Sequence, residues 1–388
     1  MQASQHPQQP QYPQPQAAQQ NFGYPPATSY AAGYPQPTGY PVRPPNKNPG
    51  HPLLTLLMLA IALFALIIIF KTFSSLLNPE PAPPPVPTQT TTAPTTQPTT
   101  TTPTTPPTTP TTPGSGYAND NYVVPDPDHN PPELPSPDTY NQATEMMQYN
   151  MVYNQRLVSP VRCDLIPIDP STATKSQMQT YLDDITACLM RVWSPSLESA
   201  GYYSARPPVV VYSGSGQSAC GKLERQNAFY CAGDQQIYYS MDLPTLLPKY
   251  QHDPILPLQI MAHEYGHAIQ AQTGILWSES AWQQSYTDSH DTSSANQVSR
   301  RTEMQADCFA GAFVTSVAQS AGISSDEQQT MQAIMLQLGD DAVSGIPGYS
   351  ADHGLGKNRQ LWFSVGLTGS TMGDCNTFAP DLPSSKIK

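Results

Sequence analysis

His263-Glu264-Tyr265-Gly266-His267 stands within an apolar run of this 388-residue chain. The two histidines are four residues apart, so on a helix their side chains lie on one face, one turn from each other. Two neutral imidazoles at this spacing can bind one zinc ion, and Glu264 then faces the coordination position that a water molecule fills. The alternative is an ordinary helix whose histidines form hydrogen bonds. The apolar surroundings favour the metal, because buried His and Glu side chains need partners and one cation satisfies all three.

A tetrahedral zinc ion with two histidines still needs a third protein ligand. A second helical run, predicted over residues 298–321, carries Glu303 and Asp307 four apart on one face. We predict that Glu303 is the third ligand, and that Asp307 accepts a hydrogen bond from the free ring N–H of a zinc-binding histidine. Two alternatives stay open: Asp307 on the metal, or two solvent-exposed carboxylates, which the apolar neighbours in this run disfavour.

The pair H-E-x-x-H and, on a later helix, E-x-x-x-D resembles the gluzincin class of metallopeptidases. The texts at residues 262–267, 303–311 and 353–354 resemble more closely a bacterial family, the putative neutral zinc metallopeptidases. The similarity covers residues 160–375 and departs from the family at residues 277–296 and in the N-terminal region. It implies Zn²⁺ as cofactor, a peptide or protein substrate, and one membrane segment before the peptidase-like domain.

The motif predicts hydrolysis without a covalent intermediate. Zinc lowers the pKa of a bound water and polarises the scissile carbonyl, while Glu264 takes the water proton and later delivers it to the leaving amine. His353, in a glycine-flanked loop, is a candidate to hydrogen-bond the oxyanion; a histidine in a surface turn is the alternative. Strands predicted within residues 207–240 could receive an extended substrate at an exposed edge.

The six cysteines all belong to the C-terminal part of the chain. An even number of cysteines in an exported domain indicates disulfides. Cysteine ligation of zinc is the weaker alternative, because the chain has no C-x-x-C spacing. Our preferred pairings are Cys220–Cys231, which flank a predicted hairpin, Cys163–Cys188 and Cys308–Cys375.

Composition divides the chain before this domain into three parts. Residues 1–50 are rich in Gln, Pro, Tyr and Gly and are predicted to form a disordered cytoplasmic tail. Residues 52–71 include 18 consecutive uncharged residues and are predicted to be a transmembrane anchor; a cleaved secretory signal is the alternative. Residues 79–137 are predicted to be an extracytoplasmic linker, whose first 35 residues hold 13 Pro and 16 Thr, a composition typical of extended spacers.

These parts predict a single-pass membrane protein with a cytoplasmic N-terminus and an extracytoplasmic C-terminal domain. Arg43 and Lys47 precede the apolar segment and Lys71 follows it, a small bias toward this orientation. All 29 acidic residues lie beyond Lys71, and this acidic domain argues against nucleic acid as a partner. The expected partners are a peptide substrate, the membrane through one helix, and the cell wall.

Residues 138–380 are predicted to form one domain. A helical run at 171–193 comes first, strands at 207–240 follow, and the remaining helices include a polar connecting helix and one at 326–338. Strands followed by helices indicate an α+β class, consistent with a zincin-like fold.

The expected function is that of a membrane-anchored zinc peptidase acting outside the cytoplasm. A catalytically silent cell-envelope binding module with a structural zinc site is the alternative from another class. Hydrolysis of a non-peptide amide is a third interpretation, because the zinc motif alone does not name the bond that is cleaved.

Overall fold

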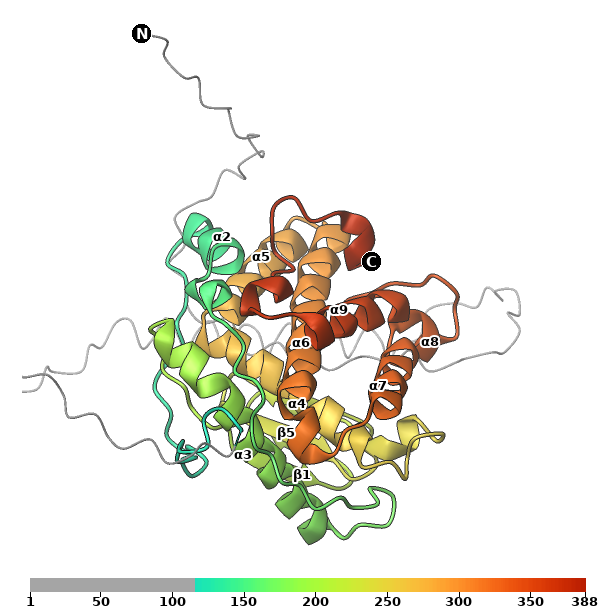
Figure 1. Ribbon diagram of the computed structural model, residues 1–388. Helices are drawn as coiled ribbons and strands as arrows, with labels where there is room; N and C mark the ends of the chain where they lie inside the picture. Colours follow the sequence, from blue (N-terminus) through green and yellow to red (C-terminus); the bar gives the residue numbers. More distant parts are fainter. Residues whose placement is uncertain (1–115) are drawn as a thin grey trace, which may run out of the picture. The chain divides into compact units, whose positions relative to one another are not determined.

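Two long helices, α4 (Ile255–Gln272) and α6 (Thr292–Ala321), pack against each other in the computed structural model, which describes residues 116–388 (Figure 1). Of the 18 residues of α4, 16 are buried, so protein encloses the helix on nearly every side. Its polar side chains must therefore find partners inside the fold. Two residues after the helix ends, Gly274 adopts the left-handed conformation, with φ of 75°, which glycine adopts without steric cost.

The helix that carries Glu303 begins at Thr292, earlier than the start at residue 298 that the sequence indicates. The Asp291 side chain accepts a hydrogen bond from the Ser294 N–H (3.0 Å) and so satisfies a free amide of the first turn. The first turns of α6 are polar, and its later part is buried. The apolar periodicity therefore reveals only the later part.

The other helices of the described residues contact this pair or one another. The runs predicted at 171–193 and 326–338 are present, and the first of them extends past Pro195. The bounds are α2 (Tyr140–Gln148), α3 (Lys175–Ser199), α5 (Ile275–Asp288), α7 (Ser325–Gln337), α8 (Asp340–Ser344) and α9 (Gly356–Thr368), with 3-10 turns η1 (Met151–Asn154), η2 (Leu243–Leu246), η3 (Met372–Cys375) and η4 (Ser384–Ile387).

Five short strands lie between α3 and α4 and form two small sheets. This gives a helix-rich α+β domain, the class that the sequence predicts. In the three-stranded sheet, β5 is central, β1 runs parallel to it and β4 antiparallel. The remaining two strands form an antiparallel hairpin. The strands are β1 (Val209–Tyr212), β2 (Gly216–Ser218), β3 (Gly221–Leu223), β4 (Ala228–Cys231) and β5 (Gln236–Ser240).

The two outer edges of the three-stranded sheet differ. The outer edge of β1 is closed by the side chain of Gln179, whose amide donates to the Val209 carbonyl (2.9 Å) and accepts from the Val211 N–H (3.3 Å). The outer edge of β4 faces α4 instead, and the Tyr230 N–H donates to the Glu264 carboxylate (2.9 Å). The edge strand β4 therefore lies directly beside the histidine motif.

Part of the segment that we expected to be linker lies against the domain. Ala118 forms a β-bridge with Val161, and Leu134 is buried in the core. At the other end, Ile387 is fully buried, beyond the expected boundary at residue 380. Backbone hydrogen bonds and single buried apolar side chains hold such short polar segments on the domain. The composition of a segment does not reveal these contacts. The tail predicted at 1–50 and the linker up to residue 115 lie outside the described residues.

Three disulfides link segments that are 11, 25 and 67 residues apart in the sequence. Cys163–Cys188 links the segment before α3 to that helix, Cys220–Cys231 links the hairpin turn to the end of β4, and Cys308–Cys375 links α6 to η3. These are the three pairings preferred from the sequence. All six cysteines are paired, so no cysteine is left as a zinc ligand.

Among residues 116–388, none of the helices is both long and apolar enough to cross a bilayer. The two longest of them, α3 and α6, carry charged residues. This finding contradicts the expected single-pass localisation, with its cytoplasmic N-terminus and extracytoplasmic domain, and we correct that prediction accordingly. The segment at 52–71, on which the expectation depended, lies outside the described residues.

Glycines allow α6 to approach two other helices very closely. A Cβ atom at Gly266 of α4 would lie 2.9 Å from the Ala306 Cα. On the other side, a Cβ at Gly366 of α9 would overlap the Cys308 carbonyl oxygen, and one at Gly311 would overlap the Phe363 carbonyl oxygen. Backbone atoms cannot move aside as a flexible side chain can, so these three positions require glycine.

We expect Gly366→Ala to destabilise the domain, because the added methyl group forces α9 away from α6. The free energy of unfolding should fall by about 1–3 kcal/mol, the usual cost of overpacking a core, as measured by denaturant titration. Thr368→Ala, at an exposed position of the same helix, is the matched control and should change it by less than about 0.5 kcal/mol. Equal stability of the two variants would contradict the close helix contact.

Candidate metal centre

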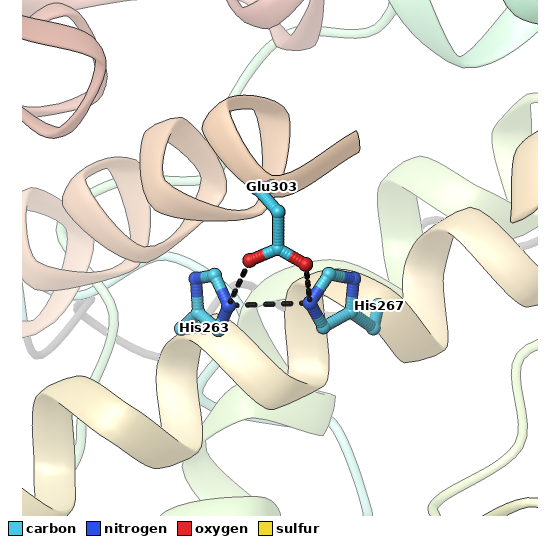
Figure 2. A group of neighbouring side chains, drawn as sticks. All are labelled: His263, His267 and Glu303. Carbon is cyan, nitrogen blue, oxygen red and sulfur yellow. Dashed lines mark hydrogen bonds and ion pairs between the residues drawn. The ribbon is translucent and has the colours of Figure 1, made fainter. Parts of the chain in front are cut away.

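His263 and His267 of α4 and Glu303 of α6 point toward one another (Figure 2). The two histidine Nε2 atoms are 3.2 Å apart, and they lie 3.3 and 3.5 Å from the two carboxylate oxygens of Glu303. His263 and Glu303 are only 8% and 6% exposed. The structure thus brings together the three residues predicted as ligands, at a buried point where two helices meet.

The Nδ1 atom of each histidine, on the side of the ring opposite Nε2, lies within hydrogen-bond distance of another side chain, and these contacts determine which ring nitrogen carries a proton. Nδ1 of His263 lies 2.8 Å from Oδ1 of Asp307, and Nδ1 of His267 lies 2.8 Å from Oε1 of Gln270. Both partners are acceptors, so each Nδ1 carries a proton, and in the neutral ring that binds a metal each Nε2 presents a lone pair to the shared point. Two lone pairs and a carboxylate that face one another repel unless a cation lies between them.

The residues present fit a zinc ion. Two imidazole nitrogens and one carboxylate oxygen are the protein ligands of one type of catalytic zinc site, which keeps a fourth position for water. Oε2 of Glu303 is buried and has no hydrogen-bond partner. A buried polar atom without a partner requires an explanation, and coordination of a metal ion provides one. Asp307 occupies the place of the carboxylate that orients a zinc-binding histidine.

Arg359 of α9 balances part of the negative charge, and the sequence analysis missed it. Its guanidinium donates two parallel hydrogen bonds to Asp307, each 2.8 Å long, and lies 4.0 Å from Glu303 Oε2. Burial opposes ionisation of Asp307, but this guanidinium holds the pKa of Asp307 below its usual range. Asp307 therefore remains an ionised acceptor for His263.

The two histidines have opposite pKa shifts, because their partners differ in charge. Burial lowers the pKa of His267 to about 4. Burial also opposes protonation of His263, but the carboxylates of Asp307 and Glu303 outweigh it and raise the pKa of His263 to about 10. The carboxylates therefore attract positive charge to this point, and either a proton or a metal ion can supply it.

Glu264 lies beside the ligands and is 6% exposed. Its Oε2 accepts a hydrogen bond from the Tyr230 N–H of β4 (2.9 Å). Burial raises the pKa of Glu264 to about 7, against the opposing effect of His263. A carboxylate with such a pKa can both accept and return a proton near neutral pH.

His353 lies in the loop between α8 and α9, outside the group of three ligands. Its Nδ1 is 3.1 Å from Oδ1 of Asp352 and 3.7 Å from Oδ1 of Asp340. Burial lowers the pKa of His353, but the nearby carboxylates, with Glu303 first among them, raise it to about 9. A Cβ atom at the next residue, Gly354, would overlap the side chain of Met304, so this loop packs against α6 beside Glu303.

Asp340 also has a structural role in this loop. Its Oδ2 accepts hydrogen bonds from the Ala351 and Gly354 N–H groups, at 2.6 and 2.7 Å. The loop that carries His353 is therefore held by a buried carboxylate at the start of α8. Asp340, Asp352 and His353 form a second group of metal-type side chains, but backbone amides already occupy much of the Asp340 carboxylate.

Some of the groups that surround the centre left a signal in the sequence. Gln270 follows His267 by three residues, on the same helical face, within a buried apolar run, and a polar residue there indicates an internal partner. Arg359 is a charged residue within a helical run that includes Trp362 and Phe363. The Tyr230 contact uses a backbone amide, which any residue type provides, so no sequence signal exists for it.

Several uncharacterized proteins are similar to this chain. The uncharacterized protein YpfJ from Escherichia coli is 26% identical over 231 residues, which cover 56% of this chain and 79% of that protein. The uncharacterized proteins Rv2575 from Mycobacterium tuberculosis and Mb2605 from Mycobacterium bovis are each 30% identical over 211 residues, covering 49% of this chain and 68% of each relative. No solved structure matches the chain.

The family described as "Putative neutral zinc metallopeptidase" matches residues 166–378, more than half of the chain. The match includes the histidine motif, the helix that carries Glu303, and the His353 loop. The family implies Zn²⁺ as the cofactor and peptides or proteins as substrates. The motifs that suggested this resemblance and the family match agree, and the chain belongs to the putative neutral zinc metallopeptidase family.

Proposed function

We propose that this protein is a zinc-dependent peptidase, in which His263, His267 and Glu303 hold the metal and Glu264 is the general base. The observation that carries the proposal is the convergence of the two Nε2 lone pairs and the Glu303 carboxylate on one buried point, with Glu264 beside it. A zinc ion bound there would lower the pKa of a water molecule and polarise a carbonyl group. This arrangement agrees with the zinc metallopeptidase family to which the chain belongs.

Glu264 is held for proton transfer by the edge strand. The Tyr230 N–H occupies Oε2, so Oε1 is the oxygen that accepts the proton of the attacking water. The raised pKa of Glu264 then favours transfer of this proton to the leaving amine. No side-chain nucleophile is needed, in line with six cysteines that are all paired in disulfides.

His353 is the proposed donor to the oxyanion. Its Nδ1 faces the carboxylates of Asp352 and Asp340 and therefore carries a proton. Those carboxylates and Glu303 raise the pKa of His353 to about 9, so near neutral pH the ring is protonated and Nε2 also carries a proton. This Nε2–H is the donor on the opposite side of the ring, and such a donor stabilises negative charge that develops on a carbonyl oxygen. The packing of Gly354 on Met304, the residue after Glu303, supports the proximity of this loop to the reacting group.

An extended peptide is the substrate form that the sheet favours. The outer edge of β4 lies beside α4, and a peptide that pairs with it would run along the histidine motif. The outer edge of β1 is closed by Gln179, so β4 is the edge of the three-stranded sheet that can add a strand.

Glu264→Gln is expected to abolish cleavage while zinc remains bound, because the amide cannot accept the water proton and Glu264 is not a ligand. Turnover should fall by about 10²–10⁴-fold, the usual contribution of a general base. Cleavage of a peptide library is measured by mass spectrometry, and bound zinc by elemental analysis. Glu145→Gln, an exposed glutamate of α2, is the control. Cleavage that survives Glu264→Gln would overturn the mechanism, and zinc without turnover in the unmodified protein would favour a binding module.

Glu303→Gln and Asp307→Asn distinguish the third ligand from the orienting carboxylate. Loss of an outer carboxylate typically weakens metal binding by about 10–100-fold, and loss of a direct ligand should cost more. We therefore expect Glu303→Gln to weaken zinc binding more than Asp307→Asn does, in competition with a chelating dye. The reverse order would place Asp307 on the metal.

The kcat/KM value is expected to rise with pH up to neutrality. Glu264 accepts a proton only when it is deprotonated, and burial raises its pKa to about 7. A bound dication favours the ionised form, so the acid limb should lie at or below that pH. A pH profile from about 5 to 8 checks this expectation, with thermal melts confirming that the protein stays folded. A profile that falls from pH 5 to 7 would contradict it.

A further inference from the structure

A chain of buried side-chain amides continues from His267 away from the metal centre. Oε1 of Gln270 lies 2.8 Å from Nδ1 of His267, and Nε2 of Gln270 donates to Oε1 of Gln305 (3.1 Å) and to the Thr302 carbonyl (2.8 Å). Nε2 of Gln305 donates in turn to the Cys375 carbonyl (3.1 Å) and the Tyr153 hydroxyl (2.9 Å). Gln270 and Gln305, which we call the amide pair, are both fully buried.

The direction of every hydrogen bond in this chain follows from its ends. A backbone carbonyl can only accept, so the NH₂ group of Gln305 must face Cys375 and that of Gln270 must face Thr302. Oε1 of Gln270 is then the atom directed at His267. Because this oxygen can only accept, the His267 proton is held on Nδ1 and the Nε2 lone pair faces the metal position.

The chain has no free end among the described residues. The Tyr153 hydroxyl accepts from Gln305 and donates to the Met147 carbonyl (2.8 Å). Turning over either amide would place NH₂ against a donor and an oxygen against a carbonyl, which is costly in a buried site. The amide pair therefore has one stable orientation.

The far end of the chain is itself tied to the helix that carries Glu303. Cys375, whose carbonyl accepts from Gln305, forms a disulfide with Cys308, the residue after Asp307. Gln305 lies on α6 between Glu303 and Asp307. One short stretch of α6 thus supplies a predicted ligand and the groups that orient both histidines: Asp307 directly, and Gln305 through Gln270.

We propose that Gln270 and Gln305 are positioning residues for the zinc centre, which fix the ring orientation and tautomer of His267 as Asp307 does for His263. The two histidines thereby have unlike supports, a neutral amide pair for one and an ion pair with Arg359 for the other. The inference depends on the zinc centre but not on peptide cleavage, because its measured quantity is metal binding.

The test compares two buried glutamines of α4. Gln270→Met keeps the shape of the side chain and removes the acceptor for His267, so zinc binding to the full chain should weaken by about 10–100-fold. Gln272→Met also removes a buried amide, one that accepts a hydrogen bond from the Ala205 N–H and donates one to the Ala205 carbonyl. Gln272 has no connection to His267. The Gln272→Met variant should lose comparable stability but bind zinc within about twofold of the unmodified protein. A side chain that does not contact a metal ligand cannot orient that ligand.

Two further variants separate orientation from packing. Gln270→Glu restores an acceptor for His267 and should recover part of the zinc affinity that Gln270→Met loses. Its second oxygen replaces the donor to the Thr302 carbonyl and to Gln305, so this variant should be less stable than the unmodified chain. Gln305→Met combined with Gln270→Met should weaken zinc binding no further than Gln270→Met alone, because Gln305 acts through Gln270. Zinc affinity is measured by competition with a chelating dye, and the visible spectrum of the Co²⁺-loaded chain reports ligand geometry.

The proposal is overturned by any of three results. Gln270→Met could bind zinc as tightly as the unmodified chain, with the same Co²⁺ spectrum. Gln272→Met could lose the same affinity, which would make the effect one of general stability. The losses of Gln270→Met and Gln305→Met could be additive, which would show that the two amides do not act as a pair. A protein that binds zinc as expected but cleaves no peptide leaves this inference intact and refutes the peptidase proposal.

Discussion

The close contact of α4 with α6 at Gly266 is the constraint on which the metal centre depends. With Ala306 packed on a glycine at this point, the side chains on either side of the contact can meet: the two histidines from α4, and Glu303 and Asp307 from α6. A larger residue at Gly266 would separate the helices and pull the carboxylate away from the imidazoles. The reciprocal glycine contacts of α6 with α9 place Arg359 within reach of Asp307 in the same way.

The buried carboxylates around this contact require positive charge, which Arg359 supplies in part and a proton on His263 or a metal ion completes. Glu264, Glu303 and Asp307 are all buried, whereas Arg359 is the buried arginine that faces them. Buried charges without partners are expensive. The fold bears this cost because many apolar contacts of α4 and α6 surround the site.

Much of this centre could be predicted because its key pairs are local: His263 with His267, and Glu303 with Asp307, each one helical turn apart. Strand pairing and the contacts of Gln305 and Arg359 could not, because they depend on tertiary contacts. Gln305 meets Gln270 only when α4 packs on α6, and Arg359 reaches Asp307 from a helix that is distant in the sequence. The composition of residues 116–137 is that of a linker, although backbone hydrogen bonds and a few buried apolar side chains hold this segment on the domain. The membrane prediction depended on a segment outside the described residues.

The closure of β1 by Gln179 has a consequence beyond substrate binding. A strand edge with free N–H and C=O groups is a template on which a second molecule can add its own strand, and repeated addition leads to aggregates. In the three-stranded sheet one edge is satisfied by a side-chain amide, and the other lies against α4. Sheets of this kind cannot extend in both directions, so a molecule that accepted a strand at β4 would not offer a matching edge for the next one. One glutamine thereby limits self-association at β1, and β4 is left as the edge that faces the histidine motif.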